Sequence, residues 1–299
     1  MSEQENKPLS KRQVWWLAAR PKTLPAAVSG VVAGTALAVH DGQFRPGPAL
    51  AALGVGLLLQ IGSNLANDVF DFERGADTPG RLGPLRVTQA GLLTPRQVKL
   101  GMLMVFGLAG LLGLYLAWQS SWGVLLIGLA AILSAILYTG GPFAYGYYGL
   151  GDLFVFIFFG LAAVVGTYFV QARAFSLAAW WMSLPIGLLV VNILVVNNLR
   201  DIENDRAVDK QTLAVRLGVR GTRLQYTILL AITYLLMPIL ILNGVLSWGA
   251  LLSWLSIPLG IKLARTVWTI QGRPLNTALA GTGQLAFVFS LLFFMGMLF

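Results

Sequence analysis

The sequence contains no cysteine and a single histidine, His40. The absence of cysteine excludes disulfides, thiolate metal ligands and a cysteine nucleophile. The one histidine lies beside Asp41 at the end of an apolar segment, which argues against a Ser-His-Asp triad or a histidine-based zinc site. Any metal bound by this chain would therefore need oxygen ligands.

Charged residues are scarce as well. They make up 11% of the 299 residues, whereas hydrophobic residues make up 57% and soluble domains carry roughly 25% charged residues. Apolar runs about 20 residues long recur along the chain, which is typical of membrane helices. No short alternating strands of the β-barrel kind are evident. The sequence predicts an all-α polytopic membrane protein.

We predict a single transmembrane domain over residues 1–299, in which residues 1–13 form a mobile polar tail. Trp15 and Trp16 suit an interfacial anchor. Glycines and alanines around 30–34 and 107–113 predict close helix packing. Nine membrane helices are expected, over residues 23–40, 47–67, 97–118, 121–139, 151–171, 177–199, 224–243, 246–265 and 277–298.

The loops between these helices predict the orientation. Basic residues cluster in the N-terminal segment, after the second and sixth helices and at the end of the eighth, and only Arg45 and Arg173 fall on the other side. The positive-inside rule then places the N-terminus in the cytoplasm and the C-terminus outside a bacterial inner membrane. Because the basic residues lie between apolar segments, membrane topology explains them better than nucleic-acid binding does.

Acidic residues are concentrated at two places. Eight of the twelve lie in two stretches at the ends of apolar segments, 64–77 and 197–210: Asp68, Asp71, Glu73, Asp77, Asp201, Glu203, Asp205 and Asp209. Ionisable groups at such depth are costly and indicate function. The matching positions suggest an internal repeat whose two halves face each other across a central cavity.

Residues three or four apart share one face of a helix, so each stretch forms a polar stripe. The stripes are Asn64, Asp68 and Asp71 in one half and Asn198, Asp201 and Asp205 in the other. Facing carboxylates repel unless a cation lies between them, and Mg²⁺ takes carboxylates together with phosphate oxygens. The pattern predicts a magnesium-bridged phosphate ester. The alternative is a pair of polar loops in which Asn and Asp cap helix ends.

The two stretches resemble those of the UbiA superfamily of membrane prenyltransferases, in the pattern Asn64-x-x-Asn67-Asp68-x-x-Asp71 with Asp77 and in Asn198-x-x-Asp201-x-x-x-Asp205. Residues 17–25, 81–91, 138–142, 148–152 and 197–218 are similar to the 1,4-dihydroxy-2-naphthoate polyprenyltransferases of menaquinone synthesis. The resemblance covers about the whole chain.

The resemblance implies a nine-helix bundle whose central cavity opens sideways to lipid. It implies Mg²⁺, as two ions, a polyprenyl diphosphate and 1,4-dihydroxy-2-naphthoate, joined with loss of CO₂ and diphosphate. Metal ligands would come from Asp68, Asp71, Asp77, Asp201 and Asp205. Because the first aspartates here are three apart, where other members space them four apart, either Asp71 or Asp77 is the second metal contact of the first motif.

Further residues are expected to contact the substrates. Arg86 is a candidate catalytic residue, together with Asp68, Asp71, Asp201 and Asp205, and Arg20, Lys22 or Arg86 would hold the naphthoate carboxylate. Tyr138, Phe143, Tyr145, Tyr147 and Tyr148 line the cavity or form an interfacial belt. Candidate substrate-binding residues are Asn64, Asn67, Asp77, Arg20, Lys22, Arg74, Arg81, Gln89, Tyr138, Tyr148, Asn198, Arg200 and Lys210.

Two alternatives remain open at this point. Another aromatic acceptor, such as 4-hydroxybenzoate, would use the same two motifs. An organic-anion or ion transporter would also have membrane helices and a repeat, although its charged site is expected at the midplane rather than at one membrane face.

Overall fold

The computed structural model describes residues 9–77 and 81–299, and this part of the chain contains helices and no strand. Eight helical segments are long and apolar enough to cross a membrane, and a ninth apolar helix, α5, is shorter. The all-helical class is confirmed, and the nine expected spans are matched approximately. The spans are α2 (Leu24–His40), α3 (Pro46–Glu73), α4 (Pro95–Gln119), α5 (Gly123–Leu137), α6–η3–α7 (Gly151–Val155, Phe156–Ala162, Ala163–Ala172), α8 (Leu177–Ala207), α9 (Leu213–Leu242), η4–α10 (Trp248–Ser256, Ile257–Thr269) and α11 (Leu275–Gly296).

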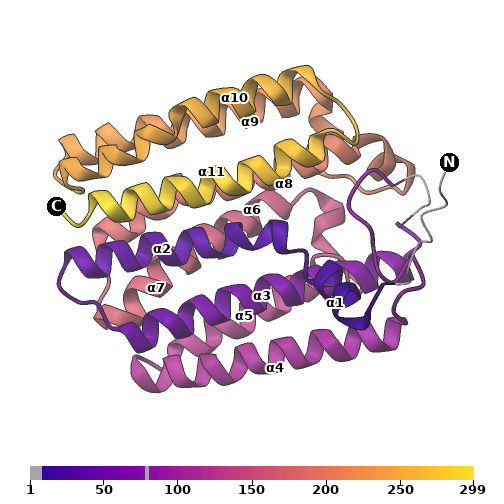
Figure 1. Cartoon of the computed structure of the whole chain (residues 1–299), viewed down its shortest axis with the longest axis horizontal. Helices are drawn as coiled ribbons and strands as arrows, with labels where there is room; N and C mark the ends of the chain where they lie inside the picture. The colour runs from indigo at the N-terminus through magenta and orange to yellow at the C-terminus, as the bar shows by residue number, and fades with distance from the viewer. Residues whose placement is uncertain (1–8, 78–80) are drawn as a thin grey trace, which may run out of the picture.

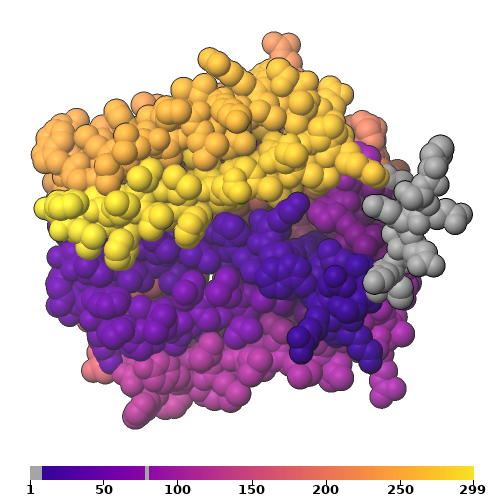
Figure 2. Space-filling view, in the orientation of Figure 1, coloured from indigo at the N-terminus to yellow at the C-terminus, as the bar shows by residue number. Residues whose placement is uncertain are grey.

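The helices lie side by side along one common direction, and α1 and the C-terminus lie at opposite ends of the bundle (Figure 1). The last helix, α11, runs along α2 in the middle of the face shown in Figure 2, so the first and last spans close the bundle. An odd number of spans accounts for this placement of α1 and the C-terminus.

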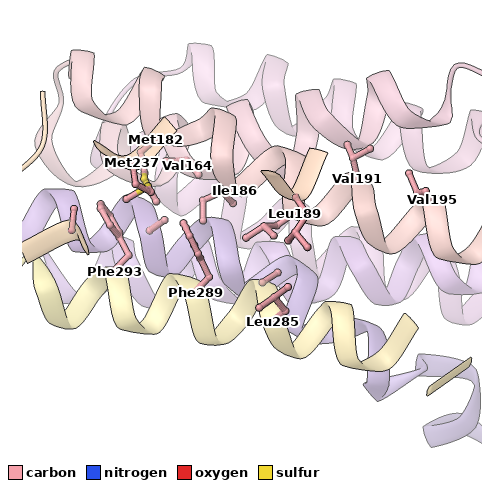
Figure 3. Packing of buried hydrophobic residues seen from close by; sticks show 14 of the residues in the cluster. Val164, Met182, Ile186, Leu189, Val191, Val195, Met237, Leu285, Phe289 and Phe293 are labelled. Atoms are coloured by element: carbon pink, nitrogen blue, oxygen red, sulfur yellow. The ribbon is translucent and has the colours of Figure 1, made fainter. Parts of the chain in front are cut away.

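The largest buried cluster lies between α8, α9 and α11. Met182, Ile186 and Leu189 of α8 meet Phe289 and Phe293 of α11, and all five are fully buried (Figure 3). Large side chains that interlock as closely as in other protein interiors leave the helices little freedom to shift. This cluster holds α8, which carries the second acidic motif, against α9 and α11.

Small residues pack α2 closely against α7, as predicted. A Cβ atom added at Gly30 would collide with Ala163, and one at Gly34 would collide with the Val164 carbonyl. The prediction is wrong for Gly107 and Gly110 of α4, because a Cβ atom there would meet nothing within 4 Å. These two glycines of α4 are not needed for a close approach to another helix.

The N-terminal segment is more ordered than predicted. Residues 1–8 of the expected mobile tail lie outside the described residues, but residues 11–13 form the first turn of α1 (Lys11–Ala19). Ser10 and Gln13 form a capping box, in which each side chain accepts a hydrogen bond from the other residue's backbone N–H. The S-x-x-Q spacing is the sequence signal of this cap.

The polar stripes of both acidic motifs lie on helices, while Asp77 of the first motif follows the end of α3. α3 continues to Glu73, beyond the predicted end at 67, and α8 continues to Ala207, beyond 199. Hydropathy falls where the carboxylates begin, but the backbone remains helical because the side chains face a polar cavity rather than lipid. The stripes predicted for the two motifs therefore lie on continuous helices.

Candidate active site

A cavity of about 1030 Å³ lies within the bundle, and polar residues of both motifs line one end of it. Such a volume is at the upper limit of typical ligand pockets. The rest of its wall is mostly apolar and extends along α3 to Ala52. The polar residues from the two motifs are Asn64, Asn67, Asp71, Asp77, Asn197, Asp201, Asn204 and Asp205.

Arg86 connects the two acidic residues of the first motif that face the cavity. Its Nη2 lies 2.8 Å from Asp71 Oδ2, and its Nε lies 3.5 Å from Asp77 Oδ1. Burial alone lowers the pKa of Arg86, but Asp71 and Asp77 outweigh burial and raise it. Arg86 is therefore a permanent cation at the cavity wall.

Asp77 and Arg81 form the next ion pair, with 3.1 Å between Oδ1 and Nη1. Burial raises the pKa of Asp77 against the effect of Arg86 and Arg81. Burial and the neighbouring Arg86 lower the pKa of Arg81 to about 10. The pKa shifts of Asp77 and Arg81 show that both charged groups are shielded from water and lie close to other charged groups.

Asp68 points toward the loop that carries Arg86. Its carboxylate accepts the backbone N–H groups of Val87 at 3.1 Å and Thr88 at 3.0 Å, and Arg20 Nη2 lies 3.8 Å away. Asp68 is buried and is not among the residues that line the cavity. Its observed contacts hold the loop at residues 86–88 against α3.

In the second motif, Arg200 holds Asp201 through two hydrogen bonds, of 2.9 Å from Nε and 2.5 Å from Nη2. The same guanidinium donates to Asn197 on its own helix and to Asn276 of α11. Asn276 in turn donates to the carbonyl of Leu82. Arg200 thus fixes Asp201 and also joins α8, α11 and the loop of the first motif.

Lys210 and Tyr147 link the two motifs. Lys210 Nζ lies 3.7 Å from Asp205 Oδ1 and 5.2 Å from the centre of the Tyr147 ring, and the Tyr147 hydroxyl donates to Asp71 at 3.1 Å. Burial lowers the pKa of Lys210, but Asp71 and Asp205 outweigh it and raise the pKa. Carboxylates from both halves therefore surround one buried cation.

Several charged atoms at this end have no hydrogen-bond partner although they are buried. They are Nε and Nη2 of Arg20, Nε and Nη1 of Arg86, and Oδ2 of Asp77. Buried polar atoms without partners are costly. The unpaired arginine nitrogens could bind the negative oxygens of a ligand, and the unpaired Asp77 oxygen could bind a cation. These atoms therefore suit an anionic ligand that is bound together with a cation.

Residues 27–294 match the UbiA prenyltransferase family. The chain belongs to this family. It is 40% identical over 273 residues to the 1,4-dihydroxy-2-naphthoate octaprenyltransferase of Escherichia coli, covering 89% of this chain and 88% of that one. It is 41% identical over 278 residues to the enzyme of the same name from Mycobacterium tuberculosis, covering 93% and 94%.

Solved structures share the UbiA fold. A UbiA homologue from Aeropyrum pernix in its apo form has a TM-score of 0.69 at 15% identity, covering 95% of this chain and 98% of that one. A UbiA homologue from Archaeoglobus fulgidus bound to DMAPP and Mg²⁺ has a TM-score of 0.61 at 17% identity, covering 94% and 96%. With its apolar helices and bacterial relatives, this UbiA chain is a multi-pass membrane protein of the bacterial inner membrane.

Some predicted residues of this UbiA chain contact the cavity and others do not. Arg20, Arg81, Tyr138 and Lys210 line it, as do the residues of both motifs given above. Lys22 is exposed and Asn198 is buried, and neither is among the lining residues.

The remaining predicted residues support the site from outside. Arg74 donates to the carbonyls of Thr139 and Gly141 and so ties α3 to the loop after α5. Gln89 donates to the carbonyl of Asp77 at 3.0 Å. Tyr148 is 49% exposed and stacks on Phe143, so this pair fits an interfacial position rather than the cavity.

Polar residues of the site that were not predicted include Gln60, Thr23 and Asn204. Gln60 and Thr23 line the cavity, and both are hydrogen bonded to Asn64. Gln60 is one helical turn before Asn64, which is a signal that the sequence did offer. Asn204 lines the cavity with its Nδ2 unpartnered, and lies between two predicted aspartates of the second stretch.

Proposed function

We propose that this chain transfers a polyprenyl group from a polyprenyl diphosphate to 1,4-dihydroxy-2-naphthoate, with loss of diphosphate and CO₂, and forms demethylmenaquinol. The observation that carries the proposal is a cavity with a buried, charged end joined to a long apolar length. A polyprenyl diphosphate is likewise divided into a charged diphosphate and a long apolar tail. The relatives from E. coli and M. tuberculosis are named for octaprenyl transfer to this acceptor.

The polar end fits Mg²⁺ in its chemistry. Asp71, Asp77, Asp201 and Asp205 line it, and Asp77 Oδ2 is buried without a partner. Among the described residues, no three carboxylates or histidines already form a metal cluster, which suits an ion that is held by one or two carboxylates and by substrate phosphate oxygens. We propose two Mg²⁺ ions, one for each motif. When bound, they would neutralise the charge that develops on the departing diphosphate. The A. fulgidus homologue bound to DMAPP and Mg²⁺ supports the use of Mg²⁺.

The cations of the chain would bind the phosphate oxygens. Arg81, Arg86 and Lys210 line the polar end, and all three are buried or nearly so. Pre-positioned donors in a site of low dielectric stabilise developing charge more strongly than water does. Their present carboxylate partners keep them in place until the substrate arrives.

Four aromatic rings follow the charged end along the cavity wall. Tyr138 meets Tyr145 edge to face at 5.5 Å, Tyr145 stacks on Phe154 at 4.0 Å, and Phe158 lies beyond Phe154 at 6.4 Å. When the allylic C–O bond breaks, positive charge develops on the prenyl carbon. Aromatic faces stabilise such a cation, and the apolar wall keeps water away from it.

The naphthoate ring would attack through the carbon that bears its carboxylate. A bond forms between that carbon and the allylic carbon, and the bond to the carboxylate then breaks to release CO₂. Arg20 and Arg86 both line the cavity, and each has two nitrogens without a hydrogen-bond partner. We propose that Arg20 holds the carboxylate, because its nearest carboxylate, Asp68, is 3.8 Å away, whereas Arg86 is bonded to Asp71 at 2.8 Å and Lys22 does not line the cavity. Arg20 has a left-handed backbone (φ 51°) between α1 and η1 (Pro21–Thr23), a conformation that is uncommon for arginine.

We propose that the N-terminus and both motifs face the cytoplasm, from which the water-soluble naphthoate would enter. Because all the charged groups lie at one end of the cavity and the apolar wall fills the rest, the arrangement favours a transferase over a transporter with a site at the midplane.

The function is tested by incubating purified protein with Mg²⁺, an octaprenyl diphosphate and 1,4-dihydroxy-2-naphthoate, and by identifying the product by mass spectrometry. We expect a product that has gained the prenyl group and lost CO₂. With 4-hydroxybenzoate as the only acceptor, we expect no product. A prenylated hydroxybenzoate that keeps its carboxylate would instead indicate the alternative acceptor.

A further inference from the structure

A second hollow lies on the outer side of the molecule, between α9 and α10. These two helices form the edge of the bundle at the top of Figure 1. α9 packs mainly on α8, and α10 packs more on α11 than on α9. The limited contact between α9 and α10 leaves a groove of about 450 Å³. Its lining residues are all different from those of the central cavity, so the groove is separate from the candidate active site.

Most of the groove is apolar. Side chains from both helices line its length, and they are Leu230, Ala231, Tyr234, Ile257, Ile261 and Ala264. Near Ile257, the Tyr234 hydroxyl lies 2.7 Å from Ser256 Oγ, and the Tyr234 carbonyl accepts the indole N–H of Trp254 at 3.2 Å. These bonds tie α9 to the turn before α10 at one end of the groove. An acyl chain is the kind of group that fits along such a surface.

The groove has about the depth of one lipid leaflet. Its lining residues on α10 run from Ile257 to Thr269, a length of about 18 Å at 1.5 Å per residue. Half of a hydrocarbon core of roughly 30 Å is a similar depth. The end at Thr269 lies beside the first half of α9, which follows the second acidic motif. This end is therefore at the membrane face of the candidate active site.

The same end of the groove is polar and basic. Arg265 lines it and is exposed, and Trp268 Nε1 donates to Thr227 Oγ1 at 2.9 Å. Arg223 lies one helical turn before Thr227, and its Nη2 donates to the carbonyl of Ile270 at 3.0 Å. The Nε of Arg223 is buried and has no hydrogen-bond partner. Tryptophan and basic residues at the end of an apolar surface are typical of the level of lipid headgroups.

The chain itself offers this positive end no counter-charge. Residues 211–299 contain six basic residues and no Asp or Glu. Among residues 9–77 and 81–299, neither Arg223 nor Arg265 forms a salt bridge. Basic pockets between membrane helices bind the phosphates of anionic lipids. An apolar length with an unneutralised positive end therefore fits an anionic lipid better than an uncharged one.

We propose that the groove binds an anionic phospholipid from the leaflet at the face of the candidate active site. One acyl chain lies between α9 and α10, and the phosphate lies at Arg265 and Arg223. The lipid fills the space between two helices that touch each other little, and it neutralises part of the excess positive charge. Because this site is apart from the cavity, its occupancy does not depend on the proposed transfer reaction.

Binding of the headgroup is tested on the purified full chain by native mass spectrometry. The protein is kept in detergent with equal amounts of phosphatidylglycerol and phosphatidylcholine that have the same acyl chains. We expect the wild-type protein to retain phosphatidylglycerol in preference to phosphatidylcholine. Arg265→Gln should lower this preference roughly tenfold, because a contact between opposite charges is lost. The control is Arg96→Gln, which removes another exposed positive charge at the same face, on α4.

A second pair of variants tests the position of the acyl chain. Ala231→Phe places a ring in the groove, whereas Ile232→Phe places one on the neighbouring exposed surface outside it. We expect Ala231→Phe to lower retention of phosphatidylglycerol roughly tenfold, because the ring takes the place of a few methylene groups of the lipid. Ile232→Phe should leave retention unchanged. Both positions are exposed, so both variants should fold, and thermal unfolding without added lipid checks this.

Equal retention of the two lipids by the wild-type protein, or equal effects of Arg265→Gln and Arg96→Gln, would overturn the headgroup site. Equal effects of the two phenylalanine variants would place the acyl chain elsewhere and overturn the groove as its site. A dimer without bound lipid would show that a second copy of the chain covers the groove instead. Prenyl transfer is measured separately on the same wild-type sample, and its absence beside normal lipid retention would contradict the proposed function alone.

Discussion

The carboxylate of Asp68 accepts the backbone N–H of Val87 at 3.1 Å, although the motif to which Asp68 belongs was expected to bind metal. The second carboxylate oxygen accepts the N–H of Thr88. Both oxygens of the carboxylate thereby hold the loop in which the preceding residue, Arg86, faces the cavity. In this structure Asp68 acts on the site through Arg86.

We therefore predict that Asp68→Asn lowers prenyl transfer by about 100-fold, in the range seen when a positioned donor is lost from an active site. The asparagine amide keeps only one acceptor oxygen, so one of the two hydrogen bonds from Val87 and Thr88 is lost. The negative charge of residue 68 is lost as well. Turnover and thermal unfolding are measured together in detergent. Glu73→Gln is the control, because Glu73 ends the same helix in a half-exposed pair with Lys99, and such pairs contribute little. Wild-type turnover in Asp68→Asn would show that the carboxylate is dispensable.

Asp201→Asn should affect both activity and stability. Arg200 is fully buried and bonded to both oxygens of Asp201, and removing one partner of a buried pair costs about 3–5 kcal/mol. We expect transfer to be abolished and the unfolding temperature to fall. Arg200 keeps its bonds to Asn197 and Asn276, so the protein should still fold.

Glu203→Gln is the matched control for Asp201→Asn. Glu203 is two residues away on α8, and its side chain is 81% exposed in a surface pair with Arg206. Its replacement should leave both measurements unchanged. If the two variants behaved alike, the second motif would not have the role proposed for it.

The apolar runs and the two acidic stretches were sufficient to predict the helical bundle and the meeting of both motifs, because hydropathy and residue spacing are local properties. The contacts of Asp68 were not predictable, because its partners are backbone N–H groups that any sequence would supply. Which glycines line the cavity was also not predictable. Gly107 and Gly128 look alike in the sequence, and only the packing of distant helices places one on the lipid face and the other at the cavity.

Metal dependence can distinguish the two candidates for the second ligand of the first motif. Asp71 is already engaged by Arg86 and Tyr147, whereas Asp77 has a buried oxygen without a partner. We predict that Asp77→Asn raises the Mg²⁺ concentration needed for half-maximal turnover more than Asp71→Asn does. Chelation of Mg²⁺ should stop transfer in the wild-type protein, and adding Mg²⁺ back should restore it. A larger shift for Asp71→Asn would assign the ligand to Asp71 instead.

The last prediction concerns the acceptor and the two basic residues that flank Pro21. Arg20 lines the cavity with two unpartnered nitrogens, and Lys22 is exposed outside it. If Arg20 holds the naphthoate carboxylate, Arg20→Lys should raise the KM for 1,4-dihydroxy-2-naphthoate about tenfold, because lysine cannot form the two parallel bonds that a guanidinium gives to a carboxylate. The KM for the prenyl diphosphate should change far less. Lys22→Ala is the control and should leave both KM values near those of the wild type. A rise confined to the prenyl diphosphate would instead place Arg20 at the phosphates.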